Sequence, residues 1–251
     1  MTDTHCHLND PEAFPNPVAA AAEAMEAGVG RLVVVGVDSE SSRLAVEIAS
    51  VAEGVFATVG WHPTSADRYK PEDLQTIRDL ASHPKCVAIG EIGYDFYWDN
   101  ASRKQQDDCL ADHLDLAAEL GKPIVFHCRN AYPALLDALE RRGAGPYLLH
   151  CFAGDKNDAD RAVALGCLFG VDGPVTYKKA DDLRAILRHI GLDKLVLETD
   201  APWLSPVPFR GKPNHPKHLG HICQGVADAL GCPASEVEKV TDANAARFFG
   251  I

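Results

Sequence analysis

The sequence alternates from end to end between short apolar runs and longer amphipathic segments, and this alternation restricts its fold more than any other feature. Runs rich in Val, Ile and Leu that stop after a few residues are buried on both faces, which is typical of strands in a parallel sheet. A helix-like segment follows each run. The eight runs are TDTHCHL, RLVVVGV, VFATVG, CVAIGEIG, PIVFHCR, PYLLHCF, CLFGV and KLVLETD.

An open doubly wound sheet and a closed barrel both accommodate such an alternation. Eight strand–helix units within 251 residues favour the (β/α)₈ or TIM barrel, which typically needs about 250 residues. No linker or internal repeat divides the sequence, and the proline-rich stretch 202–216 falls between the eighth strand and its helix. We therefore predict an α/β TIM barrel as a single domain spanning residues 1–251.

Local signals mark the ends of several helices. Gly28 is the expected stop of the first helix, and Ser39 or Ser41 is the expected N-cap of the second. Pro71 is expected in the first turn of the third helix, where a missing N–H costs nothing.

Charge and cysteine content limit the function and the compartment. With 24 Lys+Arg against 36 Asp+Glu, the net charge is −12, which excludes a protein that coats nucleic acid through bulk positive charge but permits a local basic site. The eight cysteines include no C-x-x-C pair and no zinc-finger spacing, so buried free thiols are expected. Neither a signal peptide nor a long uncharged apolar run is visible. These features predict a soluble cytoplasmic protein without membrane association.

Polar residues gather where the predicted strands end, which is where a TIM barrel builds its active site. One buried histidine is usually a core residue, but several that converge on one rim indicate a metal site. The residues at these positions are His5 and His7 (first strand), His62 (after the third), Glu91 (at the end of the fourth), His127 (fifth), His150 (sixth) and Asp200 (eighth).

Strand parity predicts which of these side chains share a face, because residues two apart point the same way. His5 and His7 should point into the barrel mouth while Cys6 faces the helices. By the same parity, His127 and Arg129 should point inward and Cys128 outward. The expected site therefore has only nitrogen and oxygen donors.

Four imidazoles and two carboxylates are too many for one tetrahedral ion and suit two divalent metals that share a bridging carboxylate. Imidazole-rich donors favour zinc, manganese or iron over magnesium, although the ligand types do not fix the metal among Zn, Mn and Mg. The predicted ligands are His5, His7, Glu91, His127, His150 and Asp200.

The motifs that contain these residues resemble the TatD family of metal-dependent deoxyribonucleases, among the amidohydrolase-like metal hydrolases. The resemblance covers nearly the whole sequence in order. It implies a TIM barrel and a divalent-metal-dependent deoxyribonuclease, expected to be an exonuclease on single-stranded DNA that uses a metal-activated water. The motifs are DTHCHL, GWHP, GEIGYDF, KPIVFHCR, LLHCFAG, FGVDGPVTYKKA, LVLETDAPWLSP, FRGKPN and NAARFFG.

The resemblance also implies roles for individual residues. His5, His7 and Asp200 are expected to hold one metal, and His127 and His150 the other. Glu91, the acid of GEIG, is expected to bridge the two. Glu91 and Asp200 are thus the expected catalytic residues, and Asp200 would also hold or deprotonate the attacking water.

Substrate contacts are predicted from the same motifs. His62, Arg129 and Arg210 are expected to hold phosphate oxygens, with a role in fixing loops as the alternative. Tyr94 and Trp203 are candidates for stacking on bases of a single strand. The late lysines Lys178, Lys179, Lys212 and Lys217 are candidates for local positive charge.

The remaining histidines are not expected to bind metal. Where many TatD-family members have Asn-Glu-Pro, this sequence has Asn214, His215 and Pro216. Because the six-ligand set is complete without them, His215, His218 and His221 are expected at the surface or near the mouth. Solvated helix positions are expected for His83, His113 and His189.

Two other functions fit the same residues. The first is a metal-dependent ester or amide hydrolase, such as an aminoacyl-tRNA deacylase or a small-molecule amidohydrolase. In many such relatives a carboxylated lysine bridges the metals from strand four, so Glu91 favours the nuclease. The second is a non-catalytic binding protein, which six convergent ligands disfavour. We therefore expect DNA, or RNA, as the substrate, and no obligate protein partner.

Overall fold

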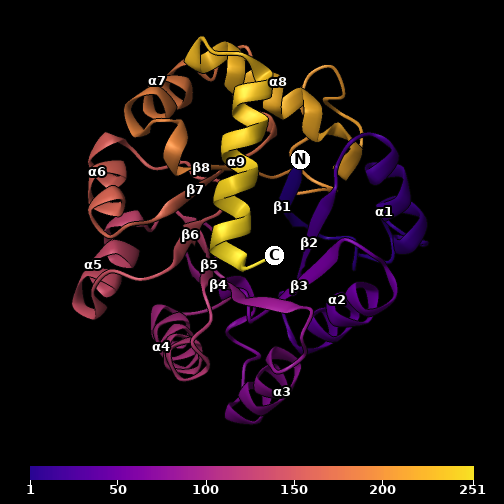
Figure 1. Cartoon of the computed structure of the whole chain (residues 1–251). Coiled ribbons are helices and arrows are strands. Elements are labelled where there is room, and N and C mark those ends of the chain that lie inside the picture. The colour runs from indigo at the N-terminus through magenta and orange to yellow at the C-terminus, as the bar shows by residue number, and fades with distance from the viewer.

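The strands form one parallel ring. The computed structural model describes residues 1–251, and it places eight strands in a single sheet in chain order. A parallel bridge between Cys6 and Ala201 joins the two ends of the sheet, so the predicted TIM barrel is confirmed (Figure 1). The strands are β1 (Thr2–Cys6), β2 (Arg31–Val35), β3 (Val55–Val59), β4 (Cys86–Asp95), β5 (Ile124–Arg129), β6 (Tyr147–Leu149), β7 (Leu168–Val171) and β8 (Leu195–Leu197).

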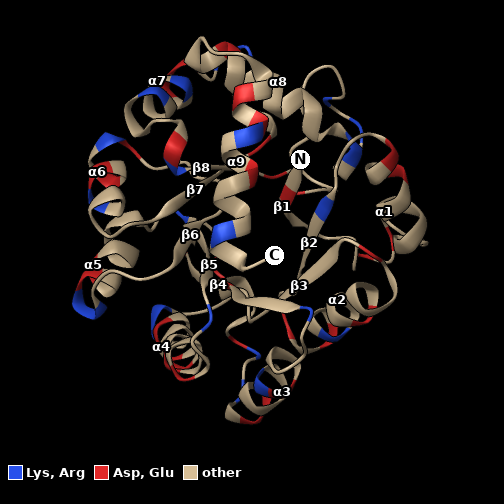
Figure 2. Ribbon diagram, in the orientation of Figure 1, with Lys and Arg blue, Asp and Glu red and all other residues tan.

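Helices surround the ring of strands (Figure 1). Charged residues of both signs lie mainly on these helices, where water solvates them (Figure 2). No helix combines the length and the apolar character that crossing a membrane requires. The helices are α1 (Pro17–Glu26), α2 (Ser39–Val51), α3 (Pro71–Ala81), α4 (Arg103–Leu120), α5 (Tyr132–Arg142), α6 (Lys156–Ala164), α7 (Asp181–Ile190), α8 (Leu219–Leu230) and α9 (Ala234–Phe249).

Side chains complete the junction between β8 and β1. The Asp3 carboxylate accepts the backbone N–H of Thr199 at 2.9 Å and its hydroxyl at 2.6 Å. The Thr4 hydroxyl donates to the carbonyl of Leu197 at 3.0 Å. These bonds hold the segment after β8 against β1, so the residues that follow both strands meet at the same point of the rim.

Helix α9 closes the amino-terminal end of the barrel. It crosses in front of the strands in Figure 1, and its Ala245 and Phe249 pack with side chains such as Val33, Val125 and Val196 from the strands. The carboxyl ends of the strands, at the opposite end, are therefore the ends that can accept a ligand.

Replacing Phe249 with Ala should destabilise the protein by about 3–5 kcal/mol, because it removes a large side chain that is 6% exposed and leaves a cavity under α9. Urea unfolding measures the change. Val51→Ala, at a side chain that is 73% exposed, is the control and should stay within about 0.5 kcal/mol of the wild type. A loss below about 1 kcal/mol for Phe249→Ala would show that α9 is not part of the cooperative core.

Most predicted helix ends are confirmed, but one N-cap is wrong. Helix α1 stops just before Gly28, which has φ +94°, and Pro71 is the first residue of α3. The N-cap of α2 is Asp38, not Ser39 or Ser41. Its carboxylate accepts the Ser41 N–H at 2.9 Å, and the Ser41 hydroxyl oxygen accepts the Asp38 N–H at 3.0 Å, a reciprocal capping box.

The prediction that His113 is solvated is wrong. His113 is fully buried on α4, and its Nδ1 hydrogen-bonds the Cys109 carbonyl one turn earlier at 2.8 Å. The pattern DDCLADHLDL placed polar residues around it, but His113 shares the inner face of the helix with Cys109. The other two histidines predicted to be solvated are more exposed than His113. His83 is half-buried just after α3, and His189 is exposed beside Asp160.

Candidate metal centre at the barrel mouth

Strand β4 runs further than the sequence predicted. Glu91 was expected at its end, but β4 continues to Asp95, with an irregular register against β5 between Ile89 and Ile92. Glu91 reaches the mouth nevertheless, because its N–H donates to the Gly36 carbonyl just beyond β2 at 3.0 Å. Two residues later, Gly93 has φ +142°, and a Cβ there would lie 2.0 Å from the His127 carbonyl oxygen. Glycine is therefore required where β4 passes His127.

The six predicted residues lie together around Glu91. Its Oε2 is 3.3 Å from His5 Nε2. Its other oxygen, Oε1, lies 2.9 Å from His127 Nδ1 and 3.2 Å from His150 Nε2. The two carboxylate oxygens of Glu91 thus face different histidines.

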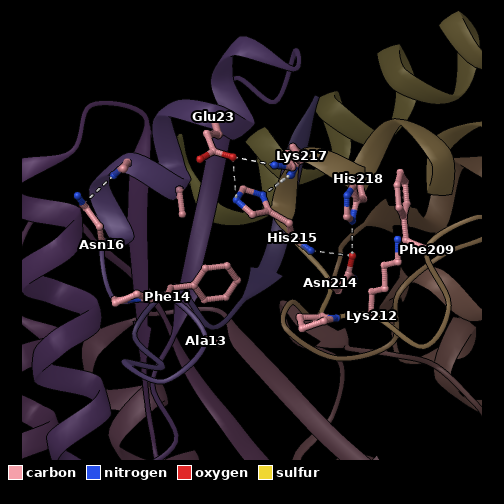
Figure 3. A pocket seen from close by; sticks show the side chains of 14 residues that line it. Ala13, Phe14, Asn16, Glu23, Phe209, Lys212, Asn214, His215, Lys217 and His218 are labelled. Carbon is pink, nitrogen blue, oxygen red and sulfur yellow. Dashed lines mark hydrogen bonds and ion pairs between the residues drawn. The ribbon is translucent and has the colours of Figure 1, made fainter.

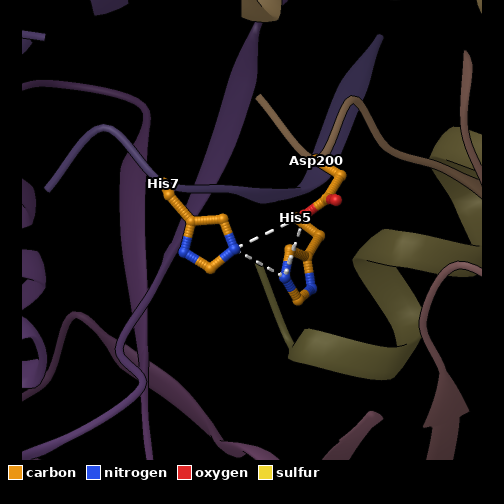
Figure 4. Close-up of side chains that lie close together, drawn as sticks. All are labelled: His5, His7 and Asp200. Carbon is orange, nitrogen blue, oxygen red and sulfur yellow. Dashed lines mark hydrogen bonds and ion pairs between the residues drawn. The ribbon is translucent and has the colours of Figure 1, made fainter. Parts of the chain in front are cut away.

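Asp200 joins the site from the segment after β8. Its Oδ1 lies 3.4 Å from His7 Nε2 and 3.8 Å from His5 Nε2, and the two histidine Nε2 atoms are 3.2 Å apart. Figure 4 shows the three side chains pointing toward one another. Asp200 has φ +52°, a left-handed conformation that Asp tolerates better than most residues.

Three groups of side chains in the mouth could each hold an ion, because their donor atoms lie within 4.8 Å of one another. The first is His5, His7 and Asp200, the set that the sequence predicted. The second unites Glu91 and His127 with His62, which the sequence had assigned to substrate. The third unites His5 and His150 with Glu198, which was not predicted. None contains a cysteine, as strand parity predicted.

Burial and charge act in opposite directions on the central carboxylates. Burial alone would raise the pKa of Glu91, but the nearby His150, His62 and His5 and the hydrogen bond from His127 hold that pKa well below its usual range. Burial likewise acts to raise the pKa of Asp200, and the bond from His7 with the charges of His150 and His5 lowers it. Both acids are therefore ionised and ready to bind a cation.

Two carboxylates that the sequence reading missed fix the ring orientation of two histidines. Asp95 Oδ2 lies 2.9 Å from His127 Nε2, and Glu198 Oε1 lies 3.2 Å from His150 Nδ1. Each bond occupies the ring nitrogen that faces away from Glu91, which is how outer carboxylates orient metal-binding imidazoles. The available signal was an acid inside each buried strand run, in step with a predicted ligand: Asp95 with Glu91, and Glu198 with Asp200.

Comparison with known proteins identifies the family. The family model described as TatD related DNase matches residues 2–250. This chain belongs to the TatD family. It is 34% identical to a Bacillus subtilis metal-dependent hydrolase, YabD, over all of this chain and 99% of that protein. It is also 34% identical to the Escherichia coli 3'-5' ssDNA/RNA exonuclease TatD, over all of this chain and 99% of that one. The crystal structure of the Escherichia coli TatD homolog YJJV has a TM-score of 0.94, with 29% identity over all of this chain and 98% of that chain. The family expected from the motifs is confirmed.

The TatD-family site opens into a cavity of about 490 Å³ at the mouth, lined by His62 and Arg129 among others. Burial and the charge of His127 lower the pKa of His62 to about 3, and its Nε2 lies 3.6 Å from Glu91. Arg210 is not among the lining residues; its guanidinium lies over the Tyr177 ring at 4.0 Å.

The two aromatic residues predicted to stack on bases, Tyr94 and Trp203, differ in their exposure. Tyr94 is buried and its hydroxyl donates to Asp107 at 2.5 Å, so the prediction that it stacks on bases is wrong. Trp203 is 51% exposed, lines the cavity and packs edge-on against the His7 ring at 4.8 Å.

A second cavity of about 500 Å³ lies between α1 and the 202–216 loop (Figure 3). His215 and His218 line it, apart from the six predicted ligands as expected. Lys217 does not supply free positive charge, because its Nζ pairs with Glu23 at 2.7 Å. Lys212 lines this second cavity instead of the mouth, while Lys178 and Lys179 are exposed.

His218 should make stability depend on pH. Its ring stacks on Phe209 at 3.9 Å, and burial, with the charges of His215 and Lys217, lowers its pKa from 6.5 to about 4. Between these values the unfolded chain binds a proton that the folded protein does not, so the free energy of unfolding falls as pH falls. His218→Gln should flatten the wild-type slope between pH 6.5 and 4 in urea unfolding, whereas Val51→Ala, at a non-titrating side chain that is 73% exposed, should leave that slope unchanged. Equal slopes for wild type and His218→Gln would contradict the assigned shift.

Proposed function

We propose that this TatD-family chain is a divalent-metal-dependent phosphodiesterase that hydrolyses nucleic acid, with DNA or RNA as substrate. The observation that carries the proposal is the convergence of four imidazoles on Glu91 and Asp200 inside one open cavity. A family of DNases and relatives named as ssDNA/RNA exonucleases support the same activity.

The chemistry of the site fits bound cations. Glu198 is fully buried, and its Oε2 has no hydrogen-bond partner. Glu91, Asp95 and Asp200 are also largely buried, and all three line the same cavity. Buried carboxylates need a compensating positive charge, and imidazole with carboxylate is a donor set that first-row divalent metals bind.

Two ions per chain fit the way the donors divide. His5, His7 and Asp200 would hold one. His127 and His150, which both face Glu91 Oε1, would hold the other, and His62 is a further candidate ligand because it groups with Glu91 and His127. Glu91 would bridge them, since Oε2 faces His5 and Oε1 faces His127 and His150. Such ions, when bound, act as Lewis acids that make a water more acidic and stabilise the charge that develops on phosphate oxygens.

Asp200 and Arg129 would have separate roles in hydrolysis. Asp200 would position the attacking water and accept its proton, as a general base must lie within hydrogen-bond reach. The bond from its own N–H to the His5 carbonyl at 2.9 Å keeps its carboxylate in place. Arg129, on the cavity wall, would hold phosphate oxygens through its planar guanidinium.

The competing function is hydrolysis of a carboxylic ester or amide, including aminoacyl-tRNA. Strand β4 supplies Glu91 where many such enzymes supply a carboxylated lysine. The family match and the named relatives also favour the nuclease. We therefore place the ester or amide hydrolase second.

The thiols support a cytoplasmic location for this enzyme. All eight cysteines are free, and Cys6 and Cys128 pack in the core as strand parity predicted. Structural disulfides are rare where glutathione and thioredoxin keep thiols reduced.

A substrate panel tests the proposed function. Protein reconstituted with Mn²⁺ or Zn²⁺ is assayed on single-stranded DNA, duplex DNA, RNA and aminoacyl-tRNA, with Glu91→Ala as the inactive control. We expect cleavage of a polynucleotide. Hydrolysis of aminoacyl-tRNA with every polynucleotide left intact would replace the nuclease with the esterase.

A further inference from the structure

The exposed aromatic side chains of this protein all lie near the mouth of the barrel. The large apolar side chains that remain exposed are four valines and three aromatics, Tyr97, Trp98 and Trp203, each about half exposed. Trp98 and Trp203 line the same cavity as Glu91 and Asp200. The third tryptophan, Trp61, is buried. Exposed tryptophan is costly in water, and its confinement to one cavity indicates a ligand with flat apolar faces.

The two tryptophans come from opposite sides of the mouth. Trp98 follows β4 and Trp203 follows β8, and these strands are four places apart in a ring of eight. The metal centre lies between them, since the cavity that both line is also lined by Glu91, His127 and Asp200. A ligand that reaches the centre therefore passes an indole on either side.

Backbone hydrogen bonds fix the turns that carry the two tryptophans. Asp95 Oδ1 accepts the backbone N–H groups of Tyr97 at 2.9 Å and of Trp98 at 3.1 Å. The Arg129 guanidinium lies 3.7 Å from the Tyr97 ring and 5.8 Å from the Trp98 ring. The backbone N–H of Trp203 donates to the Asp200 carbonyl at 2.8 Å, and its indole packs edge-on against the His7 ring. Asp95 and Asp200, which accept these backbone hydrogen bonds, also contact the site histidines.

We propose that Trp98 and Trp203 form a two-sided stacking site that takes one unpaired base on each side of the scissile phosphate. This inference rests on the proposed phosphodiesterase activity and states how the mouth would hold the bases of a single strand. In a duplex the base faces are covered by their neighbours and the strand is paired, whereas in a single strand each base can leave the stack and lie on an aromatic side chain. Arg129, held on Tyr97 beside Trp98, is placed for the adjoining phosphate.

Oligonucleotide binding tests the stacking site. The full chain carrying Asp200→Asn, loaded with Mn²⁺, is titrated with fluorescein-labelled dA₁₀ and with an abasic strand of equal length. We expect Trp98→Ala and Trp203→Ala each to weaken dA₁₀ binding about 5- to 100-fold, the range of one lost stacked base. Their effect on the abasic strand should be below about twofold. Trp98→Phe and Trp203→Phe should restore most of the affinity, and Val51→Ala, on the far end of α2, should match the parent.

Tryptophan emission provides a second readout. Binding of unlabelled dA₁₀ should quench the emission of the parent, and the Trp98→Phe, Trp203→Phe double variant, which retains only the buried Trp61, should show no quenching. Equal binding by parent and both alanine variants, or equal losses for dA₁₀ and the abasic strand, would overturn the stacking site. Hydrolysis of bis(p-nitrophenyl) phosphate by the metal-loaded wild type tests the phosphodiesterase separately, because that diester contains no nucleobase. Its absence would overturn the proposed function.

Discussion

Asp200→Asn should reduce hydrolysis of nucleic acid by at least about 10³-fold while leaving the fold intact. Asparagine has the same shape as aspartate and also tolerates the left-handed conformation at φ +52°. What disappears is one negative charge and the only carboxylate close to both His5 and His7. The loss of a general base alone costs about 10²–10⁴ in rate, and the weaker hold of His5 and His7 on a cation adds to that cost.

Steady-state rates on a labelled single strand, with circular dichroism melting of the same preparations, test this expectation. The matched control is Asp193→Asn, whose side chain is 74% exposed and which precedes β8, at the end of the barrel opposite to the mouth. It should retain wild-type activity. An Asp200→Asn enzyme that turns over within about tenfold of the wild type would exclude Asp200 as the proton acceptor.

The sequence was sufficient for the barrel and for the ligand positions because both depend on local patterns. Apolar runs separated by amphipathic segments determine the alternation, and a residue at the end of a run must lie at one rim of a parallel barrel. His5, His150 and Asp200 lie where that rule predicts. Glu91 also lies in the mouth, although β4 continues past it to Asp95. The register of β4 against β5 is irregular near Gly90. This irregularity depends on contacts with neighbouring strands, which local sequence patterns do not contain.

Parity within β4 carried information that the sequence reading did not use. Glu91, Gly93 and Asp95 alternate with Ile92 and Tyr94. Tyr94 therefore points toward the helices, where its hydroxyl donates a hydrogen bond to Asp107. The residue that does face the mouth from this side is Trp98, which lies beyond the strand. Its direction depends on the turn that Asp95 closes with two backbone N–H groups, and no strand periodicity extends into such a turn.

The roles of Asp95 and Glu198 could not be read from spacing for a different reason. Whether His127 uses Nδ1 or Nε2 toward Glu91 depends on the packing of its ring, and in the structure Nδ1 faces Glu91 while Nε2 faces Asp95. For His150 the assignment is reversed: Nε2 faces Glu91 and Nδ1 faces Glu198. Two histidines on adjacent strands with similar sequence contexts, F-H-C and L-H-C, therefore present different nitrogens to Glu91.

The net charge of −12 is compatible with a nucleic-acid substrate because of where the acids lie. Many are on the outer helices (Figure 2), separated from the mouth by the barrel wall, and salt screens them beyond about 10 Å. The acids inside the mouth are those that cations would neutralise. Binding should consequently be weak without metal and confined to a few nucleotides, since no basic stripe extends the contact.

Glu91→Gln should lower the metal content from about two ions per chain to one or fewer and reduce activity by at least about 10³-fold. Glu91 is 3% exposed, and its carboxylate is shared between the His5 side and the His127–His150 side of the centre. An amide keeps the size of the side chain but replaces one of the two oxygens by a donor that repels a cation. The first donor set would then keep His5, His7 and Asp200. The second would keep only His127 and His150 at full strength, because the shared carboxylate contributes to both sets.

Metal analysis after gel filtration and isothermal titration with Mn²⁺ measure this change independently of turnover. Glu53→Gln, at an exposed position, provides the control and should bind as much metal as the wild type. If Glu91→Gln retains two ions with unchanged affinity, Glu91 is not a bridge, and the two sets of donors must be independent. If the wild type itself binds a single ion, the groups around His5 and His127 form one site, and Asp200 and Glu91 would be ligands of the same cation.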